Sequence, residues 1–223
     1  MTPKGVAVVK MDVIGAKQNT LSEEFNKDVA AMIGQVEQDD SIKAVVVMSG
    51  KPGSWIAGAD VKMIEGFTTV EEAADKSAEG QEIMDRIAGM QKKKPWIAAI
   101  DGACLGGGLE TAMAMSHRIA TKSSKTVLGV PEVMLGLLPG AGGTQRLPKI
   151  VGAANALDLM LTGKRCSWPT RQRAPLPLTP APDAYRPWQA RCSSPTGRRR
   201  WASSTPSSTL PRSSARRSRR RRA

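Results

Sequence analysis

The chain has 223 residues, of which 40% are hydrophobic and 4% aromatic, and its formal net charge is +13. This length suits one domain of moderate size with a substantial core. The few aromatic residues argue against an RNA-binding platform built on base stacking. The chain contains no run of about 18 apolar residues, so no transmembrane helix is predicted. One His and three scattered Cys exclude a multi-histidine metal centre and favour neither a zinc site nor a disulfide framework.

The first part of the chain alternates strand and helix patterns. Residues 5–12 predict a strand and residues 44–48 a buried strand. Between them we expect a helix that begins near Thr20 or Ser22, since either side chain could cap it. Residues 70–92 then predict a long amphipathic helix.

The following elements are shorter. Strands are predicted over residues 95–100, 118–121 and 126–128, and helices over residues 109–115, 140–150 and 153–161. Strands that alternate with helices through short turns indicate an α/β domain.

The excess positive charge lies at the end of the chain. Residues 1–164 hold 18 basic and 19 acidic side chains, whereas residues 165–223 hold 15 Arg, no Lys and one acid, Asp183. The second segment also contains nine of the fifteen Pro and ten Ser, but no Val, Ile, Phe or Met. Such a composition buries too little apolar surface to offset the loss of chain entropy, so it predicts disorder.

Two interpretations of this tail, residues 165–223, compete. An arginine-rich arm ending in the run 216–222 would bind nucleic acid or another acidic surface through its charge. Alternatively, the tail is translated out of frame, because GC-rich codons read in another frame give Arg, Pro, Ser and Ala but little Lys or Ile. The abrupt change from Lys to Arg favours the second interpretation. We therefore expect a domain over residues 1–164, followed by the tail, and we do not expect nucleic acid as a partner.

A glycine-rich segment follows the predicted strand over residues 95–100. Gly106, Gly107 and Gly108 precede a helix, so their backbone N–H groups could hold a phosphate or a developing oxyanion at its positive end. The alternative is a tight strand–helix crossover that needs small residues for packing. The segment matches neither a dinucleotide-binding nor a Walker fingerprint, so NAD and ATP lack support.

Two glutamates lie in apolar surroundings. Glu110 directly follows the glycines, in the first turn of the predicted helix, and Glu132 is the only charge between Val127 and Leu138. A surface acid that favours the helix dipole is the alternative for Glu110. Two carboxylates in apolar surroundings could instead form an acid–base pair, because burial and mutual repulsion move their pKa values.

These segments together resemble the enoyl-CoA hydratase (crotonase) family. The matching motifs occur in the family's order and approximate spacing, and they are Ile56-Ala57-Gly58-Ala59-Asp60, Gly106-Gly107-Gly108-Leu109-Glu110, Pro131-Glu132 and Pro139-Gly140-Ala141-Gly142-Gly143-Thr144-Gln145-Arg146. The resemblance covers about residues 5–164 and is strongest to the hydratase domains of trifunctional fatty-acid oxidation alpha subunits. It implies an α/β crotonase spiral of ββα units. The family's C-terminal helices cover the acyl pocket and build a trimer, and we expect no counterpart to them in residues 165–223.

The resemblance also implies the hydration of trans-2-enoyl-CoA to 3-hydroxyacyl-CoA in fatty-acid β-oxidation. Glu110 would deprotonate the attacking water and Glu132 would protonate the substrate. The N–H groups of Ala59 and Gly107 would polarise the thioester carbonyl. The resemblance places CoA or substrate contacts at Ala57, Ala59, Asp60, Val61, Lys62 and Gly106. No metal and no redox cofactor is expected, since coenzyme A is part of the substrate.

Partners and location follow from the same resemblance. Family members form trimers or complexes with a thiolase subunit, and the resemblance implies a mitochondrial enzyme, or a cytoplasmic one in a bacterium. An inactive crotonase-like fragment stays open as an alternative to an active domain. The lone His117 and the apolar Cys104 are interpreted as packing or surface residues.

Overall fold

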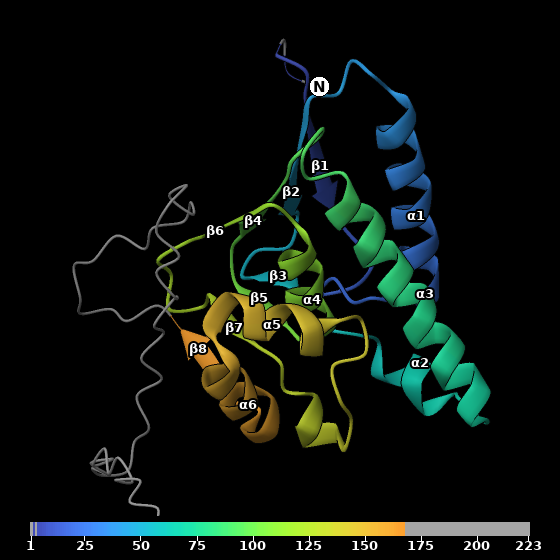
Figure 1. Ribbon diagram of the computed structural model, residues 1–223, viewed down its shortest axis with the longest axis vertical. Coiled ribbons are helices and arrows are strands. Elements are labelled where there is room, and N and C mark those ends of the chain that lie inside the picture. Colours follow the sequence, from blue (N-terminus) through green and yellow to red (C-terminus); the bar gives the residue numbers. More distant parts are fainter. Residues whose placement is uncertain (1, 3, 168–223) are drawn as a thin grey trace, which may run out of the picture. The chain divides into compact units, whose positions relative to one another are not determined.

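The computed structural model describes residues 2 and 4–167, which form two four-stranded sheets with helices around them (Figure 1). The tail and its predicted disorder lie outside the described residues from position 168 onward. The first sheet is parallel and has the order β1 (Val6–Met11), β2 (Ala44–Ser49), β4 (Trp96–Ile100) and β6 (His117–Ala120). The second has the order β3 (Ser54–Ile56), β5 (Ala103–Leu105), β7 (Val127–Gly129) and β8 (Arg165–Ser167), in which only β8 runs antiparallel to its neighbour.

The two sheets grow together as the chain winds. β2 is followed by β3, β4 by β5, and β6 by β7, so each turn adds one strand to each sheet in the same spatial order. In the first sheet Val45 pairs with Trp96, and Ile97 with His117. This arrangement confirms the predicted α/β spiral of ββα units. It also brings the ends of β3 and β5, far apart in sequence, side by side.

Two long helices lie side by side on one flank of this spiral, α1 (Glu23–Gln38) and α3 (Val70–Gly89) (Figure 1). Ser22 caps α1, because its side chain accepts a hydrogen bond from the N–H of Phe25. Thr69 and Glu72 form a capping box at the start of α3. Beneath the helices the core contains the fully buried Trp55 and Trp96.

The remaining helices are short. They are α2 (Val61–Glu65), α4 (Gly107–Ala114), the 3-10 turn η1 (Glu132–Leu135), α5 (Gly143–Val151) and α6 (Ala153–Thr162). Among the described residues, no helix has both the length and the apolar character needed to cross a membrane.

The sequence patterns missed most of the shortest elements, although they predicted β7. β3, β5 and β8 have three residues each, too few for a visible alternation, and they exist because neighbouring strands pair with them. β8 lies beyond the expected boundary at residue 164, where Cys166 pairs with Leu128. α4 begins at Gly107 rather than at Leu109, because Gly106 turns the chain with a φ of +51°. Cys104 is fully buried, and burial raises the pKa of its thiol, which fits the packing role expected for it.

Candidate functional site

The start of α4 forms the floor of the candidate site. An added Cβ at Gly108 would lie 2.4 Å from the carbonyl oxygen of Ile56, so this position must be glycine for α4 to pack against β3. Gly106 supplies no side-chain cap, and within residues 2 and 4–167 the N–H of Gly107 has no acceptor. Gly108 therefore fits the packing interpretation of the glycine segment, and the N–H of Gly107 is free for the oxyanion interpretation.

A second free N–H lies beside the first, on Ala59. The N–H of Leu21 donates to the oxygen of Gly58 at 2.9 Å, and the N–H of Asp60 donates to the oxygen of Leu21 at 3.2 Å. This bridge turns the N–H of Ala59 away from Leu21, and no acceptor reaches it in the described part of the chain. Ala59 N lies 3.9 Å from the position that a Cβ on Gly107 would take, so the two N–H groups are neighbours.

Asn19 holds the segment that carries Ala59. Its side chain is fully buried, and its amide donates to the carbonyl oxygens of Met11 at 3.2 Å and Trp55 at 3.1 Å. Its Oδ1 accepts from the N–H of Val13, and its own carbonyl accepts from the N–H of Ala57. The sequence analysis missed Asn19, since only the fold brings these three segments to one side chain.

Glu110 is buried and anchored at one carboxylate oxygen. Its side chain is 2% exposed, and Oε1 accepts hydrogen bonds from the N–H groups of Ala141 at 2.9 Å and Gly143 at 2.7 Å. Burial raises the pKa of Glu110, while these two N–H groups and the charge of Arg146 act in the opposite direction. Oε2 lies toward Gly107, 3.9 Å from the position of an added Cβ there. One oxygen is therefore fixed, and the other lies near Gly107.

Glu132 lies across from Glu110, at the start of η1. Burial raises the pKa of Glu132 to about 7, its own N–H partly offsets this, and the nearby charge of Glu110 raises it further. Its Oε2 is buried and has no hydrogen-bond partner among the described residues. Its Oε1 lies 3.0 Å from where a Cβ on Gly106 would be. The fold thus brings the two glutamates to the same glycine turn.

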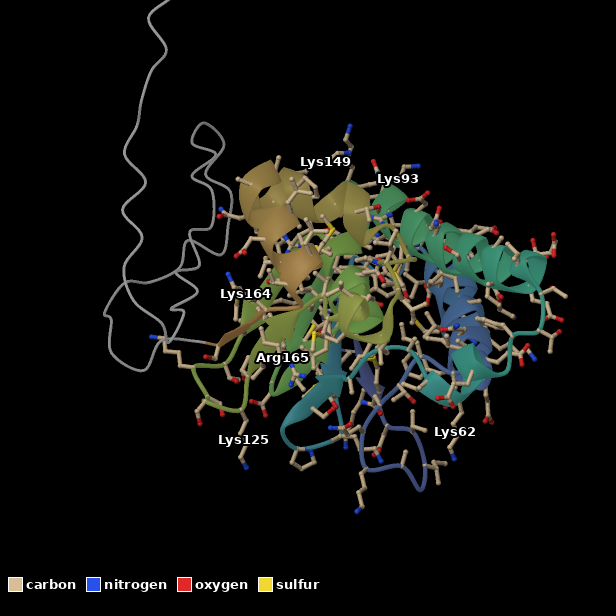
Figure 2. All side chains as sticks on the ribbon, turned by 90° about the horizontal axis from the view of Figure 1, so that it is seen from below. Lys62, Lys93, Lys125, Lys149, Lys164 and Arg165 are labelled. Atoms are coloured by element: carbon tan, nitrogen blue, oxygen red, sulfur yellow. The ribbon has the colours of Figure 1, made fainter. Side chains whose placement is uncertain are left out.

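The other predicted contact residues flank Ala59 in the chain or lie in the glycine turn. Asp60 caps α2, since its side chain accepts a hydrogen bond from the N–H of Lys62 at 2.9 Å. Val61 and Lys62 are exposed, and Figure 2 shows Lys62 at the outer surface of α2. Ala57 is half-buried between the second sheet and Ala59. Gly106 lies with Gly107 in the site itself. The described residues contain no group of three His, Cys, Asp or Glu side chains that could hold a metal ion.

Comparison with known families and proteins gives consistent results. The family model described as enoyl-CoA hydratase/isomerase matches residues 1–174. The chain is 54% identical over 160 residues to the fatty acid oxidation complex subunit alpha of Idiomarina loihiensis, and 50% identical over 161 residues to that of Shewanella loihica. Each match covers 72% of this chain but only 22% of the relative, so the chain spans about a fifth of the length of these relatives. Both relatives are bacterial, and the expected mitochondrial location finds no support in them.

Solved structures give the same picture. An enoyl-CoA hydratase from Geobacillus kaustophilus is similar with a TM-score of 0.69 and 34% identity, covering 74% of this chain and 61% of that one. An enoyl-CoA hydratase from Thermoplasma volcanium has a TM-score of 0.66 and 31% identity, covering 74% of this chain and 63% of that one.

Proposed function

The chain belongs to the enoyl-CoA hydratase/isomerase family, and on that premise we propose that it adds water to trans-2-enoyl-CoA thioesters to give 3-hydroxyacyl-CoA. One observation carries this proposal. Two carboxylates with different surroundings, Glu110 and Glu132, converge on a turn where the N–H groups of Ala59 and Gly107 are free. A base, an acid and an oxyanion site are the groups that hydration of a conjugated thioester requires.

The two free N–H groups would polarise the thioester carbonyl. When the nucleophile attacks C3, negative charge moves through the conjugated system onto the thioester oxygen. N–H groups that are already oriented stabilise this charge without reorganisation, and removing one such donor elsewhere costs about 10²–10³-fold in rate. Ala59 is held by its bridge to Leu21 and Gly107 by the start of α4, so both donors lie on rigid elements.

Glu110 is suited to the role of base. Its Oε1 is occupied by the N–H groups of Ala141 and Gly143, which favour the ionised form, and Oε2 lies near Gly107. A water bound at Oε2 would be deprotonated as its oxygen bonds to C3 of the substrate. Burial raises the pKa of Glu110 and so makes the carboxylate a stronger base than one in water.

Glu132 is suited to the role of acid. With a pKa raised to about 7, it keeps a proton at a pH where an ordinary carboxyl group has lost it. It would give this proton to C2 as the electron pair of the enolate-like state forms the new C2–H bond. The proton taken up by Glu110 returns to solvent and Glu132 is reprotonated from it, so the net change is the addition of one water across the double bond.

The relatives support a role for this reaction in fatty-acid oxidation. They are alpha subunits of a fatty acid oxidation complex, and we extend the substrate class and the assembly into a complex to this chain, with a thiolase subunit or a trimer as the arrangements implied by the resemblance. The bacterial relatives favour the cytoplasmic alternative for location. The backbone of residues 57–62 and Gly106 would contact CoA, with Ala57 and Asp60 near its adenine and Lys62 near a phosphate.

Purified chain tests the proposal through hydration of crotonyl-CoA, followed by the loss of absorbance of the conjugated thioester. We expect activity in the wild type, and a fall in kcat of about 10²–10⁴-fold in Glu110→Gln and in Glu132→Gln. Glu82→Gln, an exposed change on α3, is the matched control and should keep wild-type activity. A folded wild type without hydration, or a Glu110→Gln variant with full activity, would contradict the proposal.

A further inference from the structure

We propose that Ser77 and Gln81 of α3 are positioning residues for Glu110, a role that rests on the proposed function of Glu110 as base. They would act through the peptide group that joins Gly140 to Ala141. Neither residue touches Glu110, and both lie on a helix outside the motifs that carry the chemistry.

Both residues bind the far side of one peptide group. Ser77 Oγ and Gln81 Nε2 each donate a hydrogen bond of 2.8 Å to the carbonyl oxygen of Gly140. The N–H of the same peptide group belongs to Ala141, and it donates to Glu110 Oε1 at 2.9 Å. Because the C=O and N–H of a trans peptide point in opposite directions within one plane, the hydrogen bonds on the α3 side set the direction of the N–H on the Glu110 side.

The surface of α3 is shaped to receive this loop. Ser77 and Gln81 are four residues apart and share one helix face, where Gln81 Nε2 also donates to Ser77 Oγ at 3.2 Å. Gly80 lies between them along the chain, and a Cβ there would be 3.6 Å from the Cβ of Ala141. A Cβ on Gly140 would be 3.3 Å from Ser77 Oγ. The small residues Gly80 and Gly140 therefore let α3 pack close enough to the loop for the side chains of Ser77 and Gln81 to reach the carbonyl oxygen of Gly140.

The loop has a second, independent anchor. Arg146 of α5 donates to the carbonyl oxygen of Ala141 at 3.0 Å and forms an ion pair with Asp85 of α3. This anchor leaves the loop in place when the α3 donors to Gly140 are removed. We therefore expect loss of Ser77 and Gln81 to alter the strength and direction of one N–H bond rather than to unfold the site.

The effect on Glu110 has a definite sign. Hydrogen bonds to a carbonyl polarise its peptide group and strengthen the hydrogen bond donated by the N–H on the other side. A stronger N–H bond to Oε1 favours the ionised carboxylate and lowers its pKa. Removing the donors of Ser77 and Gln81 should therefore raise the pKa of Glu110 and loosen its orientation, so that kcat falls while substrate binding is unchanged.

The test uses the full chain with the double change Ser77→Ala/Gln81→Met, which removes both donors and keeps side-chain bulk at position 81. We expect kcat for crotonyl-CoA hydration to fall about tenfold, which is the size of effect seen when hydrogen-bond partners of metal ligands are removed. KM should stay within about twofold of wild type. The acidic limb of the pH–kcat profile should move to higher pH. Titration of the Glu110 carboxyl carbon by NMR, without substrate, should give a raised pKa. Ser77→Thr, which keeps the hydroxyl, should behave as wild type.

Gln35→Met is the matched control, because Gln35 is an exposed glutamine on α1 and should show none of these changes. A double variant that folds with unchanged pKa of Glu110 overturns the proposal, whether its kcat is unchanged or reduced. The single variant Gln81→Met, with Ser77 intact, provides the same comparison if the double variant does not fold. A wild type without hydratase activity would defeat the proposed function alone, since the NMR titration still decides whether Ser77 and Gln81 act on Glu110.

Discussion

Glu110 and Glu132 approach the same glycine turn from opposite kinds of structure. Glu110 lies in the helix α4, is 2% exposed, and has one oxygen bound by two N–H groups. Glu132 begins a single 3-10 turn whose last residues, Met134 and Leu135, are 71% and 59% exposed, and its buried Oε2 has no partner among the described residues. The two carboxyl groups are both buried and both have raised pKa values, but their hydrogen-bonding surroundings differ. Two N–H groups partly offset the effect of burial on the pKa of Glu110, whereas burial and the charge of Glu110 raise the pKa of Glu132 to about 7.

The largest effect should follow from disturbing the Glu110 side. In Gly143→Ala, the new Cβ would lie 2.7 Å from Glu110 Oε1 and 3.0 Å from its Cγ, so the carboxylate must move from its position. Because a misplaced catalytic group commonly costs about 10²-fold, we expect kcat to fall by about that factor. Steady-state hydration of crotonyl-CoA measures it. Gly89→Ala, where a Cβ meets nothing within 4 Å, is the control, and equal activity of the two variants would contradict the prediction.

A smaller effect should appear in the pH dependence, and it belongs to Glu132. An acid whose pKa is raised to about 7 loses its proton as the pH rises through that value. We therefore expect kcat to fall about tenfold for each pH unit above 7, because the protonated form then falls in that proportion. The residual activity of Glu132→Gln should lack this alkaline limb. A flat profile from about pH 6 to 9 in the wild type would show that Glu132 is not the acid.

The smallest effect concerns stability. Folding raises the pKa of Glu132 from an ordinary 4.5 to about 7, so the folded state binds this proton more tightly than the unfolded state. Stability is therefore lost as pH rises from about 4.5 to 7 and is constant above that. Glu132→Gln removes the cost of burying an ionised carboxylate. After discounting for partial solvent exposure, we expect this variant to be more stable than wild type by about 1 kcal/mol at pH 8.

Urea unfolding at pH 8 and at pH 4 measures this difference. The variant and the wild type should unfold at the same urea concentration at pH 4, where both states carry the proton. Glu82→Gln, at an exposed position on α3, should show no such dependence on pH. A variant less stable than wild type at pH 8 would mean that the Glu132 carboxylate is stabilised in the fold.

Long periodic segments and chemical motifs were predictable from the sequence. The helices α1 and α3 and the strands β1, β2 and β4 have enough residues for their hydrophobic period to show. The glycines before Glu110 were recognisable because positive φ and close backbone approach require them. The three-residue strands β3, β5 and β8 were not predictable, although β7 was, since their existence depends on pairing with neighbours far away in sequence.

The sequence by itself determined the family and an α/β domain, because motif order and hydrophobic period are properties of the chain alone. The resemblance to that family then implied the spiral of ββα units and the chemical types of the site residues. Only the tertiary structure decided that Glu110 and Glu132 converge, which oxygen of Glu110 is bound, and that the buried Oε2 of Glu132 has no partner among the described residues. It also placed Asn19, Ser77 and Gln81 behind the site. The reason is that burial and hydrogen bonding depend on which segments meet in space, and those segments lie tens of residues apart in the chain.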